Sequence, residues 1–132
     1  MLSCQTHQFL FGFTEEGMVG AMDLRRDLRY LMDQEFILTS WYENGQKWHE
    51  VTYKDGEIDG KWTSWYEDGQ KEEEETWKDG ELDGKCTEWH KNGEKSYEGT
   101  IKDGERDGKC TTWYVNGEKK WETTYKDGEP VD

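Results

Sequence analysis

The sequence predicts an all-β fold, in which one 24-residue β-hairpin unit is repeated nearly four times as an elongated, single-layer antiparallel sheet or solenoid. A tryptophan column recurs at this interval, at Trp41, Trp65, Trp89 and Trp113. Two glycine columns share the interval, at Gly45, Gly69, Gly93 and Gly117 and at Gly56, Gly80, Gly104 and Gly128. Agreement of this extent does not arise by chance, so the repeat determines the predicted architecture.

The composition indicates a thin structure rather than a globule with a large core. Only 31% of the residues are hydrophobic, 36% are charged and the net charge is −14, a balance typical of disordered chains. Eight tryptophans and seven tyrosines argue against disorder, because disordered chains are poor in aromatic residues. A repeat protein fits both observations, since each unit contacts only its neighbours and needs no central core.

Each unit is predicted to consist of two strands and two turns. In the second unit, residues 62–67 are aromatic and β-branched and form the first predicted strand, and residues 70–77 form the return strand. Asp68-Gly69 lies between them, where the other units have Asn-Gly, and such pairs are typical of a two-residue type I′ turn. A longer turn over residues 78–84 is predicted to lead to the next unit. The units are expected at residues 38–61, 62–85, 86–109 and 110–132.

A two-residue turn also predicts the cross-strand register, in which Trp41 lies opposite Trp48 and Leu38 lies opposite Val51. One face is then expected to carry the tryptophan column beside Glu50, Glu74, Glu98 and Glu122. The other face is expected to carry Tyr42, Tyr66, His90 and Tyr114 together with Tyr53, Trp77, Ile101 and Tyr125. Both faces are therefore aromatic without being strongly apolar.

Residues 1–37 do not align with the repeat and are predicted to form a helical or irregular cap. Leu24, Leu28 and Leu31 follow Asp23 at helical spacing, which predicts a helix over residues 23–33 that covers the first hairpin. A degenerate preceding unit and an artefact of gene prediction are the alternatives. The segment lacks the basic region and apolar run of a signal peptide. A cytoplasmic location is therefore expected, or an envelope-associated one if the true start lies elsewhere.

The charge of the chain limits the partners to be expected. Nucleic acid and anionic membrane surfaces are disfavoured, because phosphate binding depends on clustered lysine and arginine side chains. No stretch approaches the roughly 20 apolar residues of a membrane span. We expect no cofactor, and a chain that is monomeric or only weakly associating.

The repeat resembles a known family. Its Tyr-Glu-Asn/Asp-Gly-Gln-Lys stretch, followed by Tyr-Lys-Asp-Gly-Glu-x-Asp-Gly-Lys-Trp, is similar to the bacterial variant of the MORN repeat found in YwqK-type antitoxin proteins, from Leu38 to Asp132. The resemblance implies β-hairpin arrays that mediate protein–protein contacts, and the antitoxin label implies neutralisation of a toxin by direct binding. The Gly-x-Gly unit ending of eukaryotic members, some of which are proposed to bind lipid, is absent here.

Two columns of the unit do not repeat, and a repeat scaffold varies such positions to select its partner. The predicted partner-binding residues are Trp48, Glu72, Ser96 and Lys120 in one column, and His49, Glu73, Tyr97 and Trp121 in the next. The tryptophan column is predicted to be a structural aromatic ladder, since aromatic side chains supply most of the area buried between units. Its alternative role is a platform on which sugars or partner side chains stack.

Metal binding and catalysis have little support. Residues 55–60 open like a calcium loop, but the twelfth position, which needs a bidentate glutamate, is Tyr66. The three histidines are scattered, and no nucleophile lies beside a repeated base. We therefore expect no metal site and no enzymatic activity. Cys86 and Cys110 share the column of Trp62 and are predicted to be packing residues, about 10 Å apart across two strands and too distant for a disulfide.

The leading functional hypothesis is a non-catalytic protein-binding repeat module, with an antitoxin or immunity role as its specific form. Carbohydrate or cell-envelope binding through the aromatic columns is the alternative. A third hypothesis is an assembly element, because open sheet edges invite pairing with other strands, although charged edge residues oppose uncontrolled growth.

Overall fold

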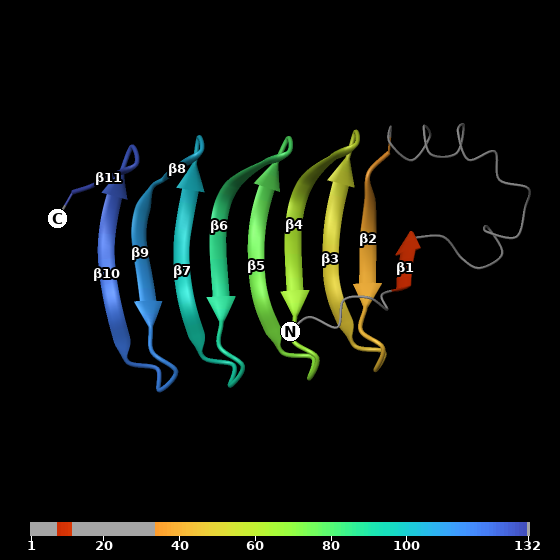
Figure 1. Cartoon of the computed structure of the whole chain (residues 1–132). Coiled ribbons are helices and arrows are strands. Elements are labelled where there is room, and N and C mark those ends of the chain that lie inside the picture. Colours follow the sequence, from red (N-terminus) through yellow and green to blue (C-terminus); the bar gives the residue numbers. More distant parts are fainter. Residues whose placement is uncertain (1–7, 12–33, 132) are drawn as a thin grey trace, which may run out of the picture.

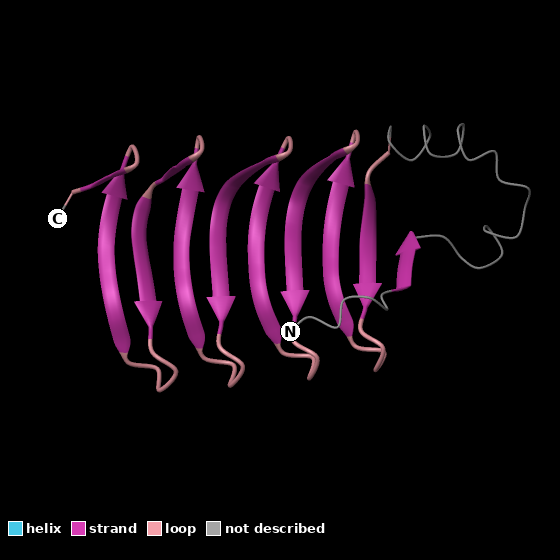
Figure 2. Cartoon of the chain, viewed as in Figure 1, coloured by secondary structure: helices cyan, strands magenta, loops and turns pink. Residues whose placement is uncertain are grey.

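The computed structural model describes residues 8–11 and 34–131 (Figure 1). Every regular element in this part of the chain is a strand, and all strands belong to one open antiparallel sheet (Figure 2). The strands are β1 (Gln8–Phe11), β2 (Phe36–Trp41), β3 (Lys47–Lys54), β4 (Glu57–Trp65), β5 (Lys71–Lys78), β6 (Glu81–Trp89), β7 (Lys95–Lys102), β8 (Glu105–Arg106), β9 (Gly108–Trp113), β10 (Lys119–Lys126) and β11 (Glu129–Pro130). The predicted all-β, single-layer architecture is confirmed.

The strands follow one another across the sheet in chain order, from β1 to β7 and on through β9, β10 and β11. The short β8 also pairs with β7, so β8 and β9 together take the place of one long strand. Each unit therefore contacts only the units before and after it, as in other repeat proteins. Figure 1 shows the strands bowed in the same direction, so the sheet has two unequal faces.

The strand β1 precedes the repeats and pairs with β2, with Gln8 opposite Trp41 and Phe11 opposite Leu38. The sequence did not predict this strand, because residues 1–37 lack the repeat pattern. The predicted helix over residues 23–33 lies outside the described residues. None of the described residues belongs to a helix that is long and apolar enough to cross a membrane.

The tight two-residue turns lie at the Lys-Asp-Gly-Glu segments. Asp55 and Gly56 have φ angles of 52° and 80°, and Lys54 pairs directly with Glu57. Two central residues with positive φ define a type I′ turn, whose twist matches that of the strands. The longer turn predicted over residues 78–84 is therefore wrong, because β5 continues to Lys78 and β6 begins at Glu81.

The Asn-Gly turns at the other end of the sheet have a different geometry from the one predicted. Gly45 has a φ of 86°, whereas Asn44 does not adopt a positive φ. The Gly45 N–H donates to the Tyr42 carbonyl oxygen at 3.0 Å, and the Tyr42 N–H donates to the Gln46 carbonyl oxygen at 2.9 Å. This pattern is a type I turn followed by a glycine bulge, which makes a three-residue loop. The Asn44 side-chain oxygen accepts from the Gln46 N–H at 3.0 Å and stabilises the loop.

The additional loop residue shifts the register beside it. Leu38 lies opposite Val51 as predicted, but Trp41 lies opposite Lys47 instead of Trp48. The same shift places Trp65 opposite Lys71 and recurs in the two later units. The first non-repeating column, Trp48, Glu72, Ser96 and Lys120, therefore lies at a β-bulge in every unit.

Burial is confined to a central strip of small side chains. The buried apolar residues among the described ones are Val51, Cys86 and Cys110. The buried polar residues are Ser40, Thr63, Ser64, Thr87 and Thr111. Cys86 and Cys110 are free thiols, as predicted from their column, and Cys110 has 0% exposure. A sheet without a second layer can bury only such a strip, which explains the low hydrophobic content.

Candidate partner-binding groove

The tyrosine and histidine column beside the Asn-Gly turns connects each unit to the next. The Tyr42 hydroxyl donates to the backbone oxygen of Trp65 at 2.7 Å, and the Tyr66 hydroxyl donates to that of Trp89 at 2.7 Å. His90 Nε2 lies 3.0 Å from the backbone oxygen of Trp113. These bonds join residues 23 positions apart, so this repeated column serves cohesion between units.

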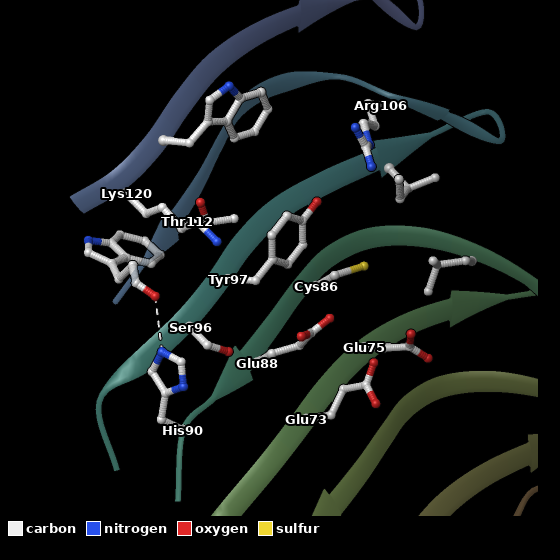
Figure 3. A pocket seen from close by; sticks show the side chains of 14 residues that line it. Glu73, Glu75, Cys86, Glu88, His90, Ser96, Tyr97, Arg106, Thr112 and Lys120 are labelled. Atoms are coloured by element: carbon white, nitrogen blue, oxygen red, sulfur yellow. Dashed lines mark hydrogen bonds between the residues drawn. The ribbon is translucent and has the colours of Figure 1, made fainter. Parts of the chain in front are cut away.

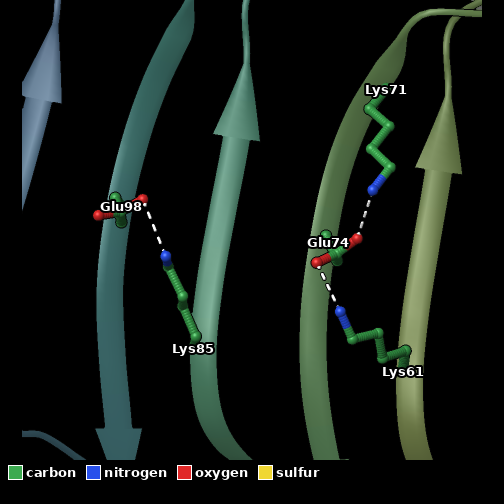
Figure 4. Close-up of polar contacts among 5 residues, drawn as sticks. All are labelled: Lys61, Lys71, Glu74, Lys85 and Glu98. Atoms are coloured by element: carbon green, nitrogen blue, oxygen red, sulfur yellow. Dashed lines mark hydrogen bonds and ion pairs between the residues drawn. The ribbon is translucent and has the colours of Figure 1, made fainter.

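The tryptophan column lies on the face that also carries the repeated glutamates, which we call the paired face. Glu74 accepts hydrogen bonds from Lys71 at 2.6 Å and from Lys61 at 2.9 Å (Figure 4). These two lysines lower the pKa of the Glu74 carboxyl. The ammonium of Lys71 also lies 5.7 Å from the centre of the Trp89 ring, at cation–π distance. The repeated lysines, glutamates and tryptophans of the paired face therefore contact one another through ion pairs and cation–π interactions.

Glu98 repeats the arrangement with Lys85, at 3.2 Å (Figure 4), and also with Lys95. Lys47 forms the matching contact in the first unit, 2.7 Å from Glu50 and 5.5 Å from the centre of the Trp65 ring. These contacts support the structural reading of the tryptophan column.

The opposite face, which we call the groove face, contains a shallow groove of about 640 Å³ that crosses β5, β6, β7, β9 and β10 (Figure 3). Of the predicted partner-binding residues, five line this groove: Glu73, Ser96, Tyr97, Lys120 and Trp121. Glu72 lines an adjoining recess, together with Tyr66 and Trp89. The groove therefore gathers side chains from the second, third and fourth units.

Trp48 and His49 do not line this groove. They lie in the first unit, where their ring centres are 3.6 Å apart. Tyr42 and Trp62 extend this cluster, with ring centres 6.2 Å from Trp48 and 5.2 Å from His49, respectively. The two columns are therefore divided between an aromatic cluster in the first unit and the groove of the later units.

One end of the groove is acidic. Glu73 lies directly opposite Glu88, and Glu75 lies opposite Cys86 in the next pair on the same face. Burial, and then the negative charges of Glu75 and Glu88, raise the pKa of Glu73 to about 7. Glu75 accepts a hydrogen bond from the indole Nε1 of Trp77 at 2.8 Å. Among the described residues, no ion pair involves Glu73, Glu75 or Glu88.

Aromatic side chains occupy the middle of the groove. The Tyr97 hydroxyl donates to Cys110 Sγ at 3.7 Å, and burial raises the pKa of Tyr97 to about 12, with a further contribution from Cys110. Gly99 gives the Tyr97 ring its space, because a Cβ at this position would overlap the Tyr97 hydroxyl and lie 3.0 Å from Cys110 Sγ.

The far end of the groove is cationic and aromatic. The guanidinium of Arg106 donates to the Tyr125 hydroxyl at 3.1 Å and lies 5.3 Å from the centre of that ring. Trp121 lies 6.4 Å from Tyr125 and is 41% exposed, while Lys120 extends over Tyr114. The groove therefore changes along its length from carboxylates at β5 and β6 to aromatic rings and cations at β9 and β10.

Fourteen residues line the groove and five of them were predicted to bind a partner, so nine were not; four of these nine are Glu75, Leu82, Glu88 and Arg106. All four lie in columns that also fail to repeat, because Glu75 aligns with Val51 and Gly99, and Arg106 aligns with Leu82 and Pro130. A wider search for non-repeating columns could have found them. Among the described residues, no group of three or more histidine, cysteine, aspartate or glutamate side chains could hold a metal ion.

The raised pKa of Glu73 predicts that the protein becomes less stable as the pH rises. Its folded-state pKa of about 7 exceeds the value of 4.5 for a free glutamate, so the folded state binds the proton more tightly. This contribution to stability is complete below pH 4.5 and is lost as the pH rises through 7. Urea unfolding at pH 5 to 8 should show this decline, and Glu73→Gln should flatten it.

Glu74→Gln is the matched control on the paired face. Its lysine partners lower the pKa of Glu74, so its contribution is present at neutral pH and is lost on acidification. The Glu74→Gln protein should retain the decline between pH 5 and 8. An unchanged decline in the Glu73→Gln protein would contradict the assignment to Glu73.

Comparison with known proteins identifies the repeat. The family model of the MORN repeat variant matches residues 37–55, 58–79 and 82–103. These segments correspond to the hairpins β2–β3, β4–β5 and β6–β7. No curated protein and no solved structure matches the chain. MORN repeats are in general non-catalytic modules that bind proteins or membranes. Three consecutive hairpins of the sheet, within residues 37–103, therefore match the MORN repeat variant.

Proposed function

We propose that the chain is a non-catalytic module that binds another protein in the groove of the groove face. The observation that carries the proposal is the different use of repeated and non-repeated residues. The repeated tyrosines, tryptophans and lysines contact neighbouring units, whereas five of the eight residues in the two variable columns line the groove. His90 and Trp113 also line the groove and join neighbouring units, but the variable side chains beside them do not take part in that repeated contact and are free to specify a partner.

The chemistry of the groove favours binding over catalysis. Burial and the surrounding carboxylates raise the pKa of Cys86 to about 11, so its thiol is protonated at neutral pH and is a poor nucleophile. The Nε2 atom of His90 is engaged with the backbone oxygen of Trp113. The Cys86 thiol is therefore not prepared for nucleophilic catalysis.

An antitoxin or immunity role is the specific form of this proposal. It requires only that the partner be neutralised by occupation of the groove, and it is suggested by the resemblance to YwqK-type proteins. Carbohydrate binding is the second candidate, because the exposed Trp121 offers a ring on which a sugar can stack. A glycan bound there would compete with a peptide in the groove.

Selection from a random peptide display library tests protein binding. Peptides enriched on the unchanged protein should lose binding to Lys120→Glu/Trp121→Ala, since both side chains line the groove and are exposed. They should keep their binding to Lys102→Glu/Val115→Ala, because these residues are exposed outside the groove and the variant makes the same change in charge. Failure to enrich any peptide that distinguishes the two variants would contradict the proposed function.

A further inference from the structure

We infer that the partner enters the groove as an extended segment whose arginine or lysine side chain is seated among Glu73, Glu75 and Glu88. The inference rests on the proposed function and names the chemistry of the partner.

The two faces of the sheet differ in whether their carboxylates are paired with lysine side chains. On the paired face, Glu74, Glu98 and Glu122 each lie within 4 Å of two lysine ammonium groups. On the groove face, the carboxylates of Glu73, Glu75 and Glu88 form no ion pair with any other described residue. The chain thus pairs the carboxylates of the paired face with its own lysines, whereas Glu73, Glu75 and Glu88 are left to be complemented by the charge of a partner.

The cross-strand positions explain why a cation is favoured there. Glu73 and Glu88 are direct cross-strand neighbours, and like charges in such positions destabilise a sheet. Burial raises the pKa of Glu73 most, and the negative charges of Glu75 and Glu88 raise it further. A guanidinium group donates several hydrogen bonds in a plane and can bridge two carboxylates, so it relieves the repulsion.

The groove fixes the length and direction of the bound segment. From Glu73 on β5 to Trp121 on β10 there are four strand spacings, since β6, β7 and β9 lie between them. At roughly 4.8 Å each they span about 19 Å, which an extended chain covers in about six residues. Arg106 and Lys120 line the far end and repel a second cation there. The segment should therefore carry its cation at one end and an apolar side chain about six residues away, against Trp121.

A designed peptide panel tests the inference by fluorescence anisotropy. The probe is fluorescein-labelled Arg-Thr-Ser-Thr-Ser-Thr-Leu-Thr, and two control peptides carry glutamine or glutamate in place of the arginine. At 150 mM salt the arginine peptide should bind at least tenfold more tightly than the glutamine peptide, and the glutamate peptide should bind more weakly still. The affinity of the arginine peptide should also rise between pH 6 and 8, because Glu73 loses its proton over this range.

Two protein variants with equal charge locate the binding. Glu73→Gln/Glu88→Gln should weaken the arginine peptide at least tenfold, whereas Glu74→Gln/Glu98→Gln on the paired face should change its affinity less than threefold, since salt screens distant charges. Equal losses in both variants, or equal binding of the arginine and glutamine peptides, would overturn the inference. If the library instead yields neutral or acidic peptides that depend on Lys120 and Trp121, the proposed function stands and only this inference fails.

Discussion

Replacing Gly84 with alanine is expected to destabilise the protein by about 2–4 kcal/mol. Gly84 has a φ of 134°, and a Cβ added there would lie 2.8 Å from the Cβ of Thr76. The clash arises at the register shift between β5 and β6, where Thr76 alone faces residues 83–85. Neither Cβ is at the flexible end of a side chain, so relief requires movement of a strand.

Gly108 supplies a matched control, because it occupies the same column one unit later. Its φ is 84°, and a Cβ there would meet no heavy atom within 4 Å. Gly108→Ala should therefore cost only about 1 kcal/mol, for the left-handed backbone alone. Urea unfolding of both variants measures the difference. Equal losses would show that backbone conformation, and not contact with Thr76, determines the effect.

Replacing Gly99 with valine is expected to destabilise the protein by about 2–3 kcal/mol through overpacking. Val51 occupies the same column in the first unit and is buried there, so the column accepts this side chain elsewhere. The obstacles at position 99 are the Tyr97 hydroxyl, which a Cβ would overlap, and Cys110 Sγ at 3.0 Å. The Tyr97 ring should therefore be displaced from its place over Gly99.

A double-mutant cycle with Tyr97→Ala checks the physical cause. The cost of Gly99→Val should fall by about 1–2 kcal/mol in the Tyr97→Ala background, because the main obstacle is gone. Absorbance titration gives a second readout, since the pKa of a displaced Tyr97 should decrease from about 12 toward the ordinary value of 10. Additive free energies and an unchanged pKa would together contradict this explanation.

The repeat period was sufficient to predict the strands, but not the two turns. Asp55-Gly56 and Asn44-Gly45 both fit a type I′ turn by composition, yet only the former adopts it. The Asn44 side-chain oxygen accepts a hydrogen bond from the Gln46 N–H, which stabilises the three-residue loop. In this loop Asn44 does not adopt the positive φ that a type I′ turn requires. The period remains 24 residues because the residues removed from the second predicted loop extend the strand that follows it, so that β6 begins at Glu81.

The groove was predictable only in part. In the sequence, all members of one repeat column are equivalent, whereas in the structure their surroundings differ from unit to unit. Tyr97 and Trp121 line the groove, whereas His49 of the same column stacks against Trp48 in the first unit. Which copies share a surface depends on the size of their neighbours, such as the absence of a side chain at Gly99. The sequence identifies the variable columns but contains no direct signal for this difference.

The hydrogen bonds that join residues 23 positions apart have a consequence for how such a chain can change in length. Tyr66 donates to the backbone oxygen of Trp89, and His90 meets the equivalent oxygen of Trp113. If residues 86–109 were deleted, Tyr66 would come to lie beside Trp113 and find the same acceptor. Gain or loss of a whole unit therefore requires no new type of contact between units. Duplication of a unit within the gene could lengthen the groove while the existing hydrogen bonds between units are kept.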